Sequence, residues 1–303
     1  MTQVLTIMDF RKQFKSEEDC LKYLVEIKWG DGFKCVKCSN DKWSKGRQWF
    51  YRRCKACGYD ESATANTMFH KCKLGLLRAF EIGFRVSVKK KGMSSCELGR
   101  EFGCQQRSAW LMKAKFQNAM KSSDNYPLEA QVEVDEFLVG GFDENEVGRS
   151  LESKQLVVLG VEKVIDKKDN VTIGRAYARV IENASAKELK PFFEQKINKD
   201  SNITTDGWRG YWPLQKDWNI EQKLSKKGKG FKELHIHIMN IKGWLRGIHH
   251  KCKGNRLQQY LDEFHFRFNR RGFLGTILHK LLVRAMELKP CPYKTIMVCE
   301  LNT

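Results

Sequence analysis

The 303-residue sequence contains no run of 18 apolar residues, which excludes a membrane-spanning helix of ordinary length. Its first ten residues lack the basic segment followed by an apolar one that is typical of a secretory signal. We therefore expect the protein to stay in the cytoplasm. In that reducing compartment, its 11 cysteines suggest metal binding before disulfide formation.

Positive charge dominates the sequence, with 55 Lys and Arg against 36 Asp and Glu and a formal net charge of +19. The charge is uneven: residues 1–125 carry +12, residues 126–220 carry −4 and residues 221–303 carry +11. Two basic flanks around an acidic centre favour a protein that grips a polyanion and holds a cation between the flanks, although a basic surface can also be merely solvated. Nucleic acid is favoured over membrane because no basic amphipathic helix with a bulky apolar face is evident.

Four cysteines form the sharpest local motif. Cys35 and Cys38 make one CxxC pair, and Cys54 and Cys57 make a second. Each pair can place two thiolates on one metal, and together they complete the tetrahedral set of a structural Zn²⁺ site. The aromatic residues between the pairs predict a small β-hairpin, so the segment reads as a zinc ribbon. The alternative is four free, buried thiols; the other seven cysteines lack paired spacing and read as ordinary core or surface residues.

Helical patterns surround this ribbon. Residues 9–29 read as a helix with Ser16 as N-cap, and residues 74–88 read as another. Two more helical stretches, 95–102 and 105–120, are broken by Gly103-Cys104 and resemble a helix-turn-helix. An ordinary helical hairpin is the alternative. In the helix-turn-helix interpretation, Arg107 and Lys113 of the second helix are candidate DNA contacts.

The centre of the chain alternates strand and helix patterns. A helix is expected at 185–196, with Ser185 as N-cap and Glu188 at the capping-box position. The predicted strands are 131–139, 155–162, 172–181 and 202–205, and the helices that follow are 234–248 and 254–269. This order is typical of an α/β layered domain with a mixed sheet, in which ligands gather where strand ends converge.

Two aspartates lie on or directly after predicted strands. Asp135 lies in the strand Gln131–Val139, and Asp206 follows the short apolar run 202–205. Carboxylates that meet at strand ends can hold Mg²⁺, a cation that prefers oxygen ligands. Glu133 shares the strand face of Asp135, whereas Glu136 points away. Each aspartate has an alternative role in capping a turn or a following helix.

The combination of motifs resembles the DDE transposases of small prokaryotic insertion sequences. The resemblance rests on the zinc ribbon, the helix-turn-helix, Val-Glu-Val-Asp135-Glu-Phe, Thr-Asp206-Gly-Trp, and the stretches His235–His250 and Leu257–Arg271. It spans roughly residues 15–275 and is specific in combination. It implies a ribonuclease-H-like catalytic fold, Mg²⁺-dependent cleavage of double-stranded DNA at element ends (with Mn²⁺ as a possible substitute), and strand transfer by the freed 3′-hydroxyl. It also implies that Asp135 and Asp206 are the first two metal ligands.

The third catalytic position departs from the usual glutamate. Counting 34 residues from Asp206 reaches Asn240, and no acidic residue lies between Glu233 and Asp262. In the family that the sequence resembles, some members use asparagine there. An amide oxygen can coordinate Mg²⁺ but carries no charge and cannot act as a base. Asn240 is thus the expected third residue and Glu233 the fallback ligand; the alternative for Asn240 is an ordinary solvent-facing helical asparagine.

Basic residues after this position are candidate DNA contacts. Lys242 and Arg246 share a helix face because they are four residues apart. The remaining candidates are His249, His250, Lys251 and Arg256. A solvated basic stripe is the alternative interpretation, and a metal site at the two histidines is disfavoured because adjacent residues point in different directions on a helix.

The sequence therefore predicts an insertion-sequence transposase that is associated with the nucleoid and assembles as a homo-oligomer when it pairs two DNA ends. The predicted parts are an N-terminal helix (1–30), a zinc ribbon (31–70), a helix-turn-helix region (71–122), a catalytic domain (123–275) and a C-terminal tail (276–303). The alternatives are a catalytically inactive DNA-binding regulator derived from a transposase and a structure-specific nuclease on the same scaffold.

Overall fold

The protein falls into two compact units. Unit 1 comprises residues 1–120 and 273–302, and unit 2 comprises residues 121–272. The residues that the computed structural model describes are 6–140, 154–224, 230–249 and 256–298. His250 and Lys251, two of the predicted DNA contacts, lie outside the described residues.

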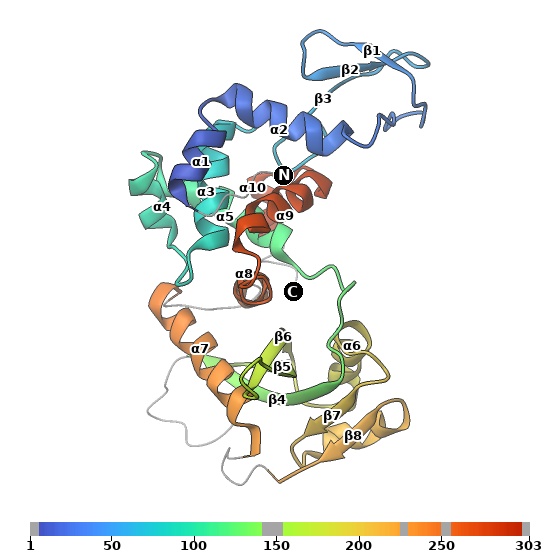
Figure 1. Cartoon of the computed structure of the whole chain (residues 1–303), viewed down its shortest axis with the longest axis vertical. Helices are drawn as coiled ribbons and strands as arrows, with labels where there is room; N and C mark the ends of the chain where they lie inside the picture. The colour runs from blue at the N-terminus through green and yellow to red at the C-terminus, as the bar shows by residue number, and fades with distance from the viewer. Residues whose placement is uncertain (1–5, 141–153, 225–229, 250–255, 299–303) are drawn as a thin grey trace. The chain divides into compact units, whose positions relative to one another are not determined.

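Unit 1 combines a small sheet with helices that share an aromatic core. Its helices are α1 (Ile7–Gln13), α2 (Glu17–Trp29), α3 (Leu76–Val88), α4 (Ser95–Glu101), α5 (Gln106–Met120), α9 (Leu274–Glu287) and α10 (Tyr293–Val298) (Figure 1). Reciprocal capping boxes begin α1, α2 and α4 at Thr6, Ser16 and Ser94, and the one at Ser16 confirms the sequence-based N-cap. The buried rings of Phe14 and Phe80, 5.1 Å apart, pack α3 against the segment that joins α1 to α2.

The predicted C-terminal tail is wrong in part, because most of helix α9 forms within it. Residues 276–303 were predicted to be a separate C-terminal tail, whereas Leu274–Glu287 form a helix of unit 1 that contacts α2, α3 and α5. Ile277, Leu281 and Ala285 are fully buried along it. Their spacing of four residues places them on one face of a helix, and the sequence analysis overlooked this signal.

The two helices of the predicted helix-turn-helix are confirmed as α4 and α5. The turn between them passes through Gly103, whose φ of 60° lies in the left-handed region that glycine adopts without strain. At Gly99, a Cβ atom would lie 2.9 Å from the carbonyl oxygen of Cys104, so glycine allows the turn to approach α4 closely. Most of α5 is buried and contacts α3 and α9, which leaves its first turn as the exposed part.

The cysteine-rich segment of unit 1 forms a three-stranded antiparallel sheet of β1 (Trp43–Lys45), β2 (Tyr51–Cys54) and β3 (Asp60–Ser62). The predicted hairpin is therefore extended by one strand. Lys28 of α2 pairs with the fully buried Glu61 at 2.8 Å and donates hydrogen bonds to the carbonyls of Ser62 and Ala65. This buried ion pair connects α2 to the sheet.

Unit 2 is built on a five-stranded mixed sheet in the order β6-β5-β4-β7-β8. Its strands are β4 (Gln131–Gly140), β5 (Lys154–Ile165), β6 (Val171–Ile181), β7 (Asn202–Thr205) and β8 (Asn219–Gln222). Strands β4, β5 and β6 pair antiparallel, whereas β7 runs parallel to both β4 and β8. The predicted α/β class with a mixed sheet is confirmed.

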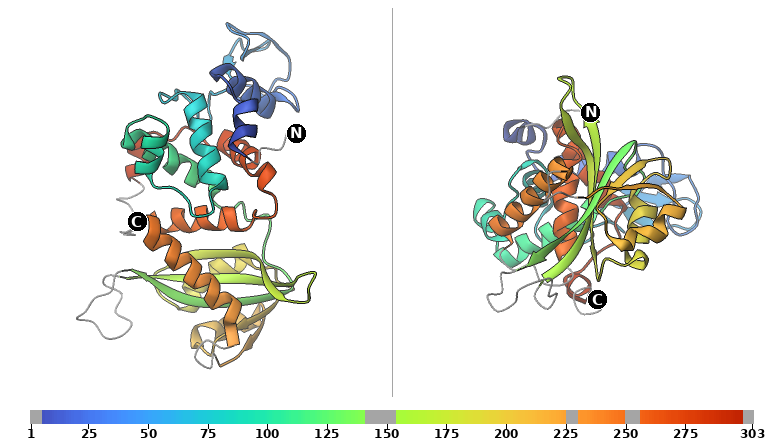
Figure 2. Two further views of the ribbon diagram at one scale, coloured as in Figure 1. Left: turned by 60° about the vertical axis from the view of Figure 1, so that its left-hand side comes forward. Right: turned by 90° about the horizontal axis from the view of Figure 1, so that it is seen from below.

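Helices cover both faces of this sheet (Figure 2). They are α6 (Ala186–Lys196), the 3₁₀ helix η1 (Arg209–Lys216), α7 (Lys232–Ile248) and α8 (Arg256–Phe268). Phe137 and Val139 of β4 share a core with α7 and α8, whereas Val132 and Val134 share a core with α6 and η1. Successive side chains of β4 point to opposite faces of the sheet, so this one strand contributes to both cores.

Amide side chains occupy the outer edge of β6. Asn269 accepts a hydrogen bond from the backbone N–H of Ala176 and donates one to its carbonyl, both at 2.9 Å. Gln258 of α8 does the same for the N–H of Val180 and the carbonyl of Ala178, at 2.9 and 3.1 Å. These bonds satisfy edge groups that would otherwise be open to pairing with another strand.

The sequence analysis located the predicted elements of unit 2 closely but missed two short ones. The four predicted strands match β4 to β7 to within three residues at each end. Ser185 is the N-cap residue of α6, but its side chain makes no capping hydrogen bond, so the predicted capping box with Glu188 is wrong. The short η1 and β8 were not predicted.

Among the described residues, no helix is both long and apolar enough to cross a membrane.

Candidate active site and zinc centre

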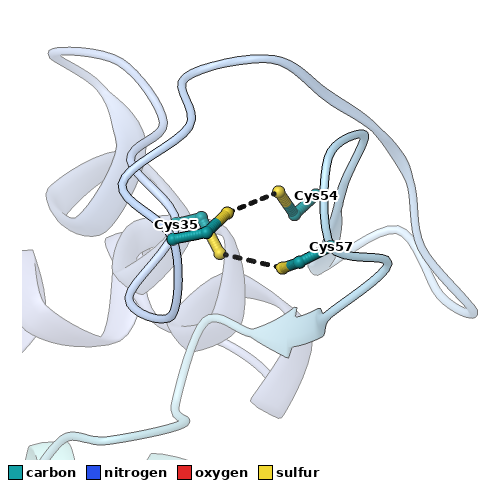
Figure 3. Close-up of side chains that lie close together, drawn as sticks. Cys35, Cys54 and Cys57 are labelled. Atoms are coloured by element: carbon teal, nitrogen blue, oxygen red, sulfur yellow. Dashed lines mark hydrogen bonds between the residues drawn. The ribbon is translucent and has the colours of Figure 1, made fainter.

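The four cysteines of the zinc-ribbon motif converge in unit 1. Their sulfur atoms all lie within 4.8 Å of one another. The Sγ–Sγ distance is 3.6 Å between Cys35 and Cys57 and 3.5 Å between Cys38 and Cys54 (Figure 3). Four thiolates at about 2.3 Å from a tetrahedral zinc ion would lie about 3.8 Å apart. The sulfur cluster therefore fits the predicted structural Zn²⁺ site.

The two aspartates are brought together by the pairing of β4 with β7. The parallel register pairs Val134 with Thr205, so Asp135 and Asp206 are the next residues on adjacent strands. Neighbouring strands lie about 4.8 Å apart, so the pairing brings the two carboxylates close together. Both aspartates line a single pocket of about 530 Å³ in unit 2. Its other lining residues are Glu136, Phe137, Leu138, Leu156, Asn183, Ala184, Trp208, His235, Ile238 and Lys242.

Backbone donors orient both carboxylates. Oδ1 of Asp135 accepts a hydrogen bond from the N–H of Glu136 at 2.8 Å, and Oδ1 of Asp206 accepts one from the N–H of Trp208 at 3.0 Å. The turn-capping role that the sequence left open for Asp206 is therefore present. It does not compete with the pocket position, because a carboxylate has two oxygens and several acceptor sites.

A buried contact behind the pocket joins β4 to η1. The fully buried Tyr211 of η1 donates its hydroxyl hydrogen bond to the carboxylate of Glu136. Burial, together with the negative charges of Asp135 and Asp206, raises the pKa of Glu136 to about 7. This contact connects β4, next to Asp135, to the helix that follows β7 and Asp206. The sequence predicted that Glu136 points away from Asp135, but its partner could not be identified without the fold.

The other acidic neighbour, Glu133, has a structural role. It lies two residues before Asp135 on the same strand face, as expected, but is 4% exposed and pairs with Lys163 of β5 at 2.8 Å. It does not line the pocket. Its charge is already compensated by a neighbouring strand, so it is not a candidate ligand.

Helix α7 contributes His235 to the pocket, whereas the predicted third residue, Asn240, lies outside the pocket lining. Nε2 of His235 lies 3.8 Å from Oδ2 of Asp135, and His235, Ile238 and Lys242 line the pocket. Asn240 is exposed and does not line it. A helix turns about 100° per residue, so Asn240 lies about 200° around α7 from Ile238. The fallback residue Glu233 does not line the pocket either.

The pocket residues offer donors suited to a divalent cation. Carboxylate oxygens suit Mg²⁺ and Mn²⁺, and an imidazole nitrogen moves the preference toward the softer Mn²⁺. Nε2 of His235 is buried and makes no hydrogen bond to any described residue. A buried nitrogen of this kind is what a metal ligand requires before the ion binds. Asp135, Asp206 and His235 therefore offer a set of donors that suits a divalent cation, and the role of Asn240 stays a prediction.

A lysine places positive charge in the lining of the same pocket. Lys242 is partly buried and its ammonium lies 5.6 Å from the ring centroid of Phe137. Burial lowers the pKa of Lys242, and the nearby Arg246 lowers it further. Arg246 is exposed one turn along α7. The predicted shared face of these two residues is thus consistent with a surface that extends outward from the pocket.

The remaining predicted DNA contacts do not line the pocket. His249 is stacked on Tyr260 with ring centroids 3.6 Å apart, and Arg256 is partly buried at the start of α8. In unit 1, Arg107 is exposed and its guanidinium lies over the ring of Tyr293 at 4.5 Å.

Lys113 requires a correction, because its position is incompatible with the predicted DNA contact. It is 4% exposed, and Nζ donates a hydrogen bond of 2.7 Å to the carbonyl of Met93. Its helix position faces α3 and the turn before α4 rather than solvent. Charge alone suggested a surface role for this residue, whereas its position on the buried side of α5 gives it a structural one.

Comparison with known protein families agrees with this organisation. Residues 127–269 match the ISXO2-like transposase domain, and residues 15–60 match the transposase zinc-ribbon domain. A search of curated proteins found no match. The first domain contains both aspartates and α7, and the second contains all four cysteines of the sulfur cluster. The chain therefore belongs to the insertion-sequence transposases that combine an N-terminal zinc ribbon with a DDE-type catalytic domain.

Proposed function

We propose that the protein binds the ends of its insertion sequence, cleaves the DNA there and joins the freed 3′-hydroxyl to a target. The observation that carries this proposal is the single pocket that contains Asp135 and Asp206 from paired strands together with His235 and Lys242 from α7. Acidic and imidazole donors beside a basic group fit a site for a cation and a phosphodiester.

Each pocket residue would have a role that follows from its position. Asp135, Asp206 and His235 would hold Mg²⁺ or Mn²⁺, which activates the attacking oxygen and stabilises the leaving one. Lys242 lines the same pocket as the carboxylates and would neutralise charge on a phosphate bound there. Glu136 and Tyr211 would act as positioning residues, because their buried hydrogen bond holds η1 against β4 beside Asp135.

Double-stranded DNA is the proposed partner of both units. In unit 1, the exposed first turn of α5 with Arg107 and the basic zinc ribbon offer contacts to element ends. In unit 2, Arg246 would extend the phosphate-binding surface beyond the pocket, with His249 and Arg256 as further candidates. Pairing two ends requires two sites, so we expect a homo-oligomer on DNA and, in the cell, association with the nucleoid.

A labelled duplex that carries the inverted repeats flanking the coding region tests this function. We expect nicking at the repeat boundary with Mn²⁺ or Mg²⁺, none with EDTA, and a joined product when a target plasmid is added. Hydrolysis without joining would indicate the nuclease alternative. Binding of the ends without any cleavage would indicate the inactive regulator.

The third ligand can be tested by comparing two positions on α7. We expect His235→Ala to lower cleavage about 10- to 100-fold, because the site loses one of three donors and holds the cation more weakly. Asn240→Ala should change cleavage less than about twofold, since Asn240 is exposed and outside the pocket. Rates are to be measured across a Mn²⁺ titration, which separates weaker cation binding from a slower step.

His235→Glu provides the matched comparison. A carboxylate at this position should restore cleavage and shift the preference from Mn²⁺ toward Mg²⁺, since an oxygen ligand replaces nitrogen. A larger defect in Asn240→Ala than in His235→Ala would return the third position to Asn240.

A further inference from the structure

The wall of the pocket contains a large exposed aromatic ring that the cation site does not explain. Trp208 is 41% exposed and lines the same pocket as Asp135, Asp206 and His235. It follows Asp206 by two residues, at the loop where β7 leads into η1. Tryptophan side chains are usually largely buried because of their apolar area. An exposed one beside the acidic groups therefore suggests a surface kept open for a ligand.

Hydrogen bonds along its length fix the position of Trp208. Its backbone N–H donates to Oδ1 of Asp206 at 3.0 Å, and its carbonyl accepts from Nε2 of Gln222 at 2.9 Å. The indole Nε1–H donates to the carbonyl of Ala184 at 2.7 Å. The ring is thus held at a set position relative to the carboxylate of Asp206. Its only polar atom is engaged, so what it can offer a ligand is the π-face.

Gly210 makes this placement possible. A Cβ atom at Gly210 would lie 2.2 Å from the carbonyl oxygen of Ala184 and 2.6 Å from Nε1 of Trp208. Any larger residue would therefore displace the ring or its acceptor. The backbone packs closely against the indole edge, which supports the ring from behind.

Neighbouring side chains indicate that the ligand is a nucleic acid base. Trp212 of η1 is 54% exposed, and the guanidinium of Arg209 lies 5.7 Å from the centroid of its ring. Aromatic faces interleaved with basic groups are typical of surfaces that stack bases and follow a phosphate backbone. Lys242 adds a further positive charge to the pocket itself.

We propose that Trp208 stacks on a nucleobase next to the scissile phosphate, after that base has separated from its neighbour in the duplex. This proposal rests on the proposed function, because it assumes that the pocket receives the DNA end. A fixed ring at the pocket wall compensates for the lost stacking within the DNA. Stacking is tolerant of base identity, so Trp208 would hold the strand in position and contribute little to sequence recognition.

A thermodynamic cycle on DNA binding tests the proposal without relying on cleavage. Duplexes with an abasic nucleotide at each position near the repeat boundary are bound to the Asp135→Asn protein, with and without Trp208→Ala, and affinities are measured by fluorescence anisotropy. We expect each change alone to weaken binding about 5- to 150-fold at one position. Together they should weaken it no further, because both remove the same contact.

Two further variants keep the result interpretable. Trp208→Phe retains an aromatic face without the N–H donor and should keep most of the affinity and the coupling to the same nucleotide. Tyr126→Ala removes a side chain that is 65% exposed but outside the pocket lining, and it should show no coupling at any position. Circular dichroism confirms that each variant is folded.

The outcomes separate this proposal from the function on which it rests. Additive losses at every position, or equal affinities for Trp208→Ala and the protein without that change, would overturn the stacking proposal even if the wild-type protein cleaves DNA. Coupling at one nucleotide combined with no cleavage by the wild type would support stacking and count against the catalytic function. If Trp208→Ala does not fold, loss of coupling in folded Trp208→Phe overturns the proposal instead.

Discussion

Asp135→Asn and Asp206→Asn are each expected to lower DNA cleavage by about a thousandfold or more while changing the affinity for element ends less than about threefold. Each substitution removes a negative charge from the cation site but keeps the size of the side chain. A bound cation contributes several kcal/mol to the stabilisation of developing charge, and each 1.4 kcal/mol is tenfold in rate. Affinity should be retained because most of the proposed DNA contacts lie outside the pocket.

The measurement compares single-turnover cleavage with end binding in the same preparation. Asp217→Asn is the matched control, because Asp217 is also in unit 2, lies outside the pocket lining and has a side chain that is 48% exposed. It should cleave at the wild-type rate. If either pocket variant retains more than a tenth of the wild-type rate, the assignment of that aspartate as a cation ligand is wrong.

Removal of zinc is expected to unfold the zinc ribbon while unit 2 stays folded. The ribbon sheet consists of strands of three or four residues, and the main apolar cluster around its cysteines contains Phe33, Trp29 and Tyr59. So small a core cannot by itself offset the conformational entropy of the folded segment. Zinc bound by four thiolates supplies the missing stability, since the site forms only in the folded state.

Limited proteolysis after treatment with a strong chelator provides the measurement. New cleavage sites should appear within residues 30–65, with a loss of circular dichroism signal and a metal content near zero, and Cys38→Ser should behave in the same way. Cys96→Ser is the control, because Cys96 is exposed on α4 and outside the sulfur cluster. Unchanged proteolysis of this segment without zinc would show that the metal is not structural.

The zinc ribbon shows how far a local pattern can be interpreted. Two CxxC pairs predict a four-sulfur site because each pair brings its two thiolates together within one tight turn, whatever the rest of the fold does. The sulfur cluster confirms this expectation. The strands of unit 2 could also be predicted from the sequence, because each is an apolar run between polar stretches. The missed η1 and β8 are short and carry weaker patterns.

Helix α7 shows what local patterns leave open. Counting residues from Asp206 selected Asn240, but a count does not fix the rotation of a helix about its axis. Rotation is set by burial: Leu234, Ile241 and Leu245 pack into the core, and this orientation turns His235 and Lys242 toward the pocket. The apolar stripe was readable in the sequence and, used as a helical wheel, would have predicted that Asn240 lies on the exposed side of α7.

The sequence by itself determined the zinc ligands, the α/β class, the two catalytic aspartate candidates and the family, because each depends on spacing within a short segment. Only the tertiary structure showed that His235 lies in the pocket with the aspartates, that Lys113 is interior, and that Trp208 is exposed beside Asp206. These facts depend on contacts between segments far apart in the chain. Strand register and helix rotation create those contacts, and both are set by the packing of the whole core.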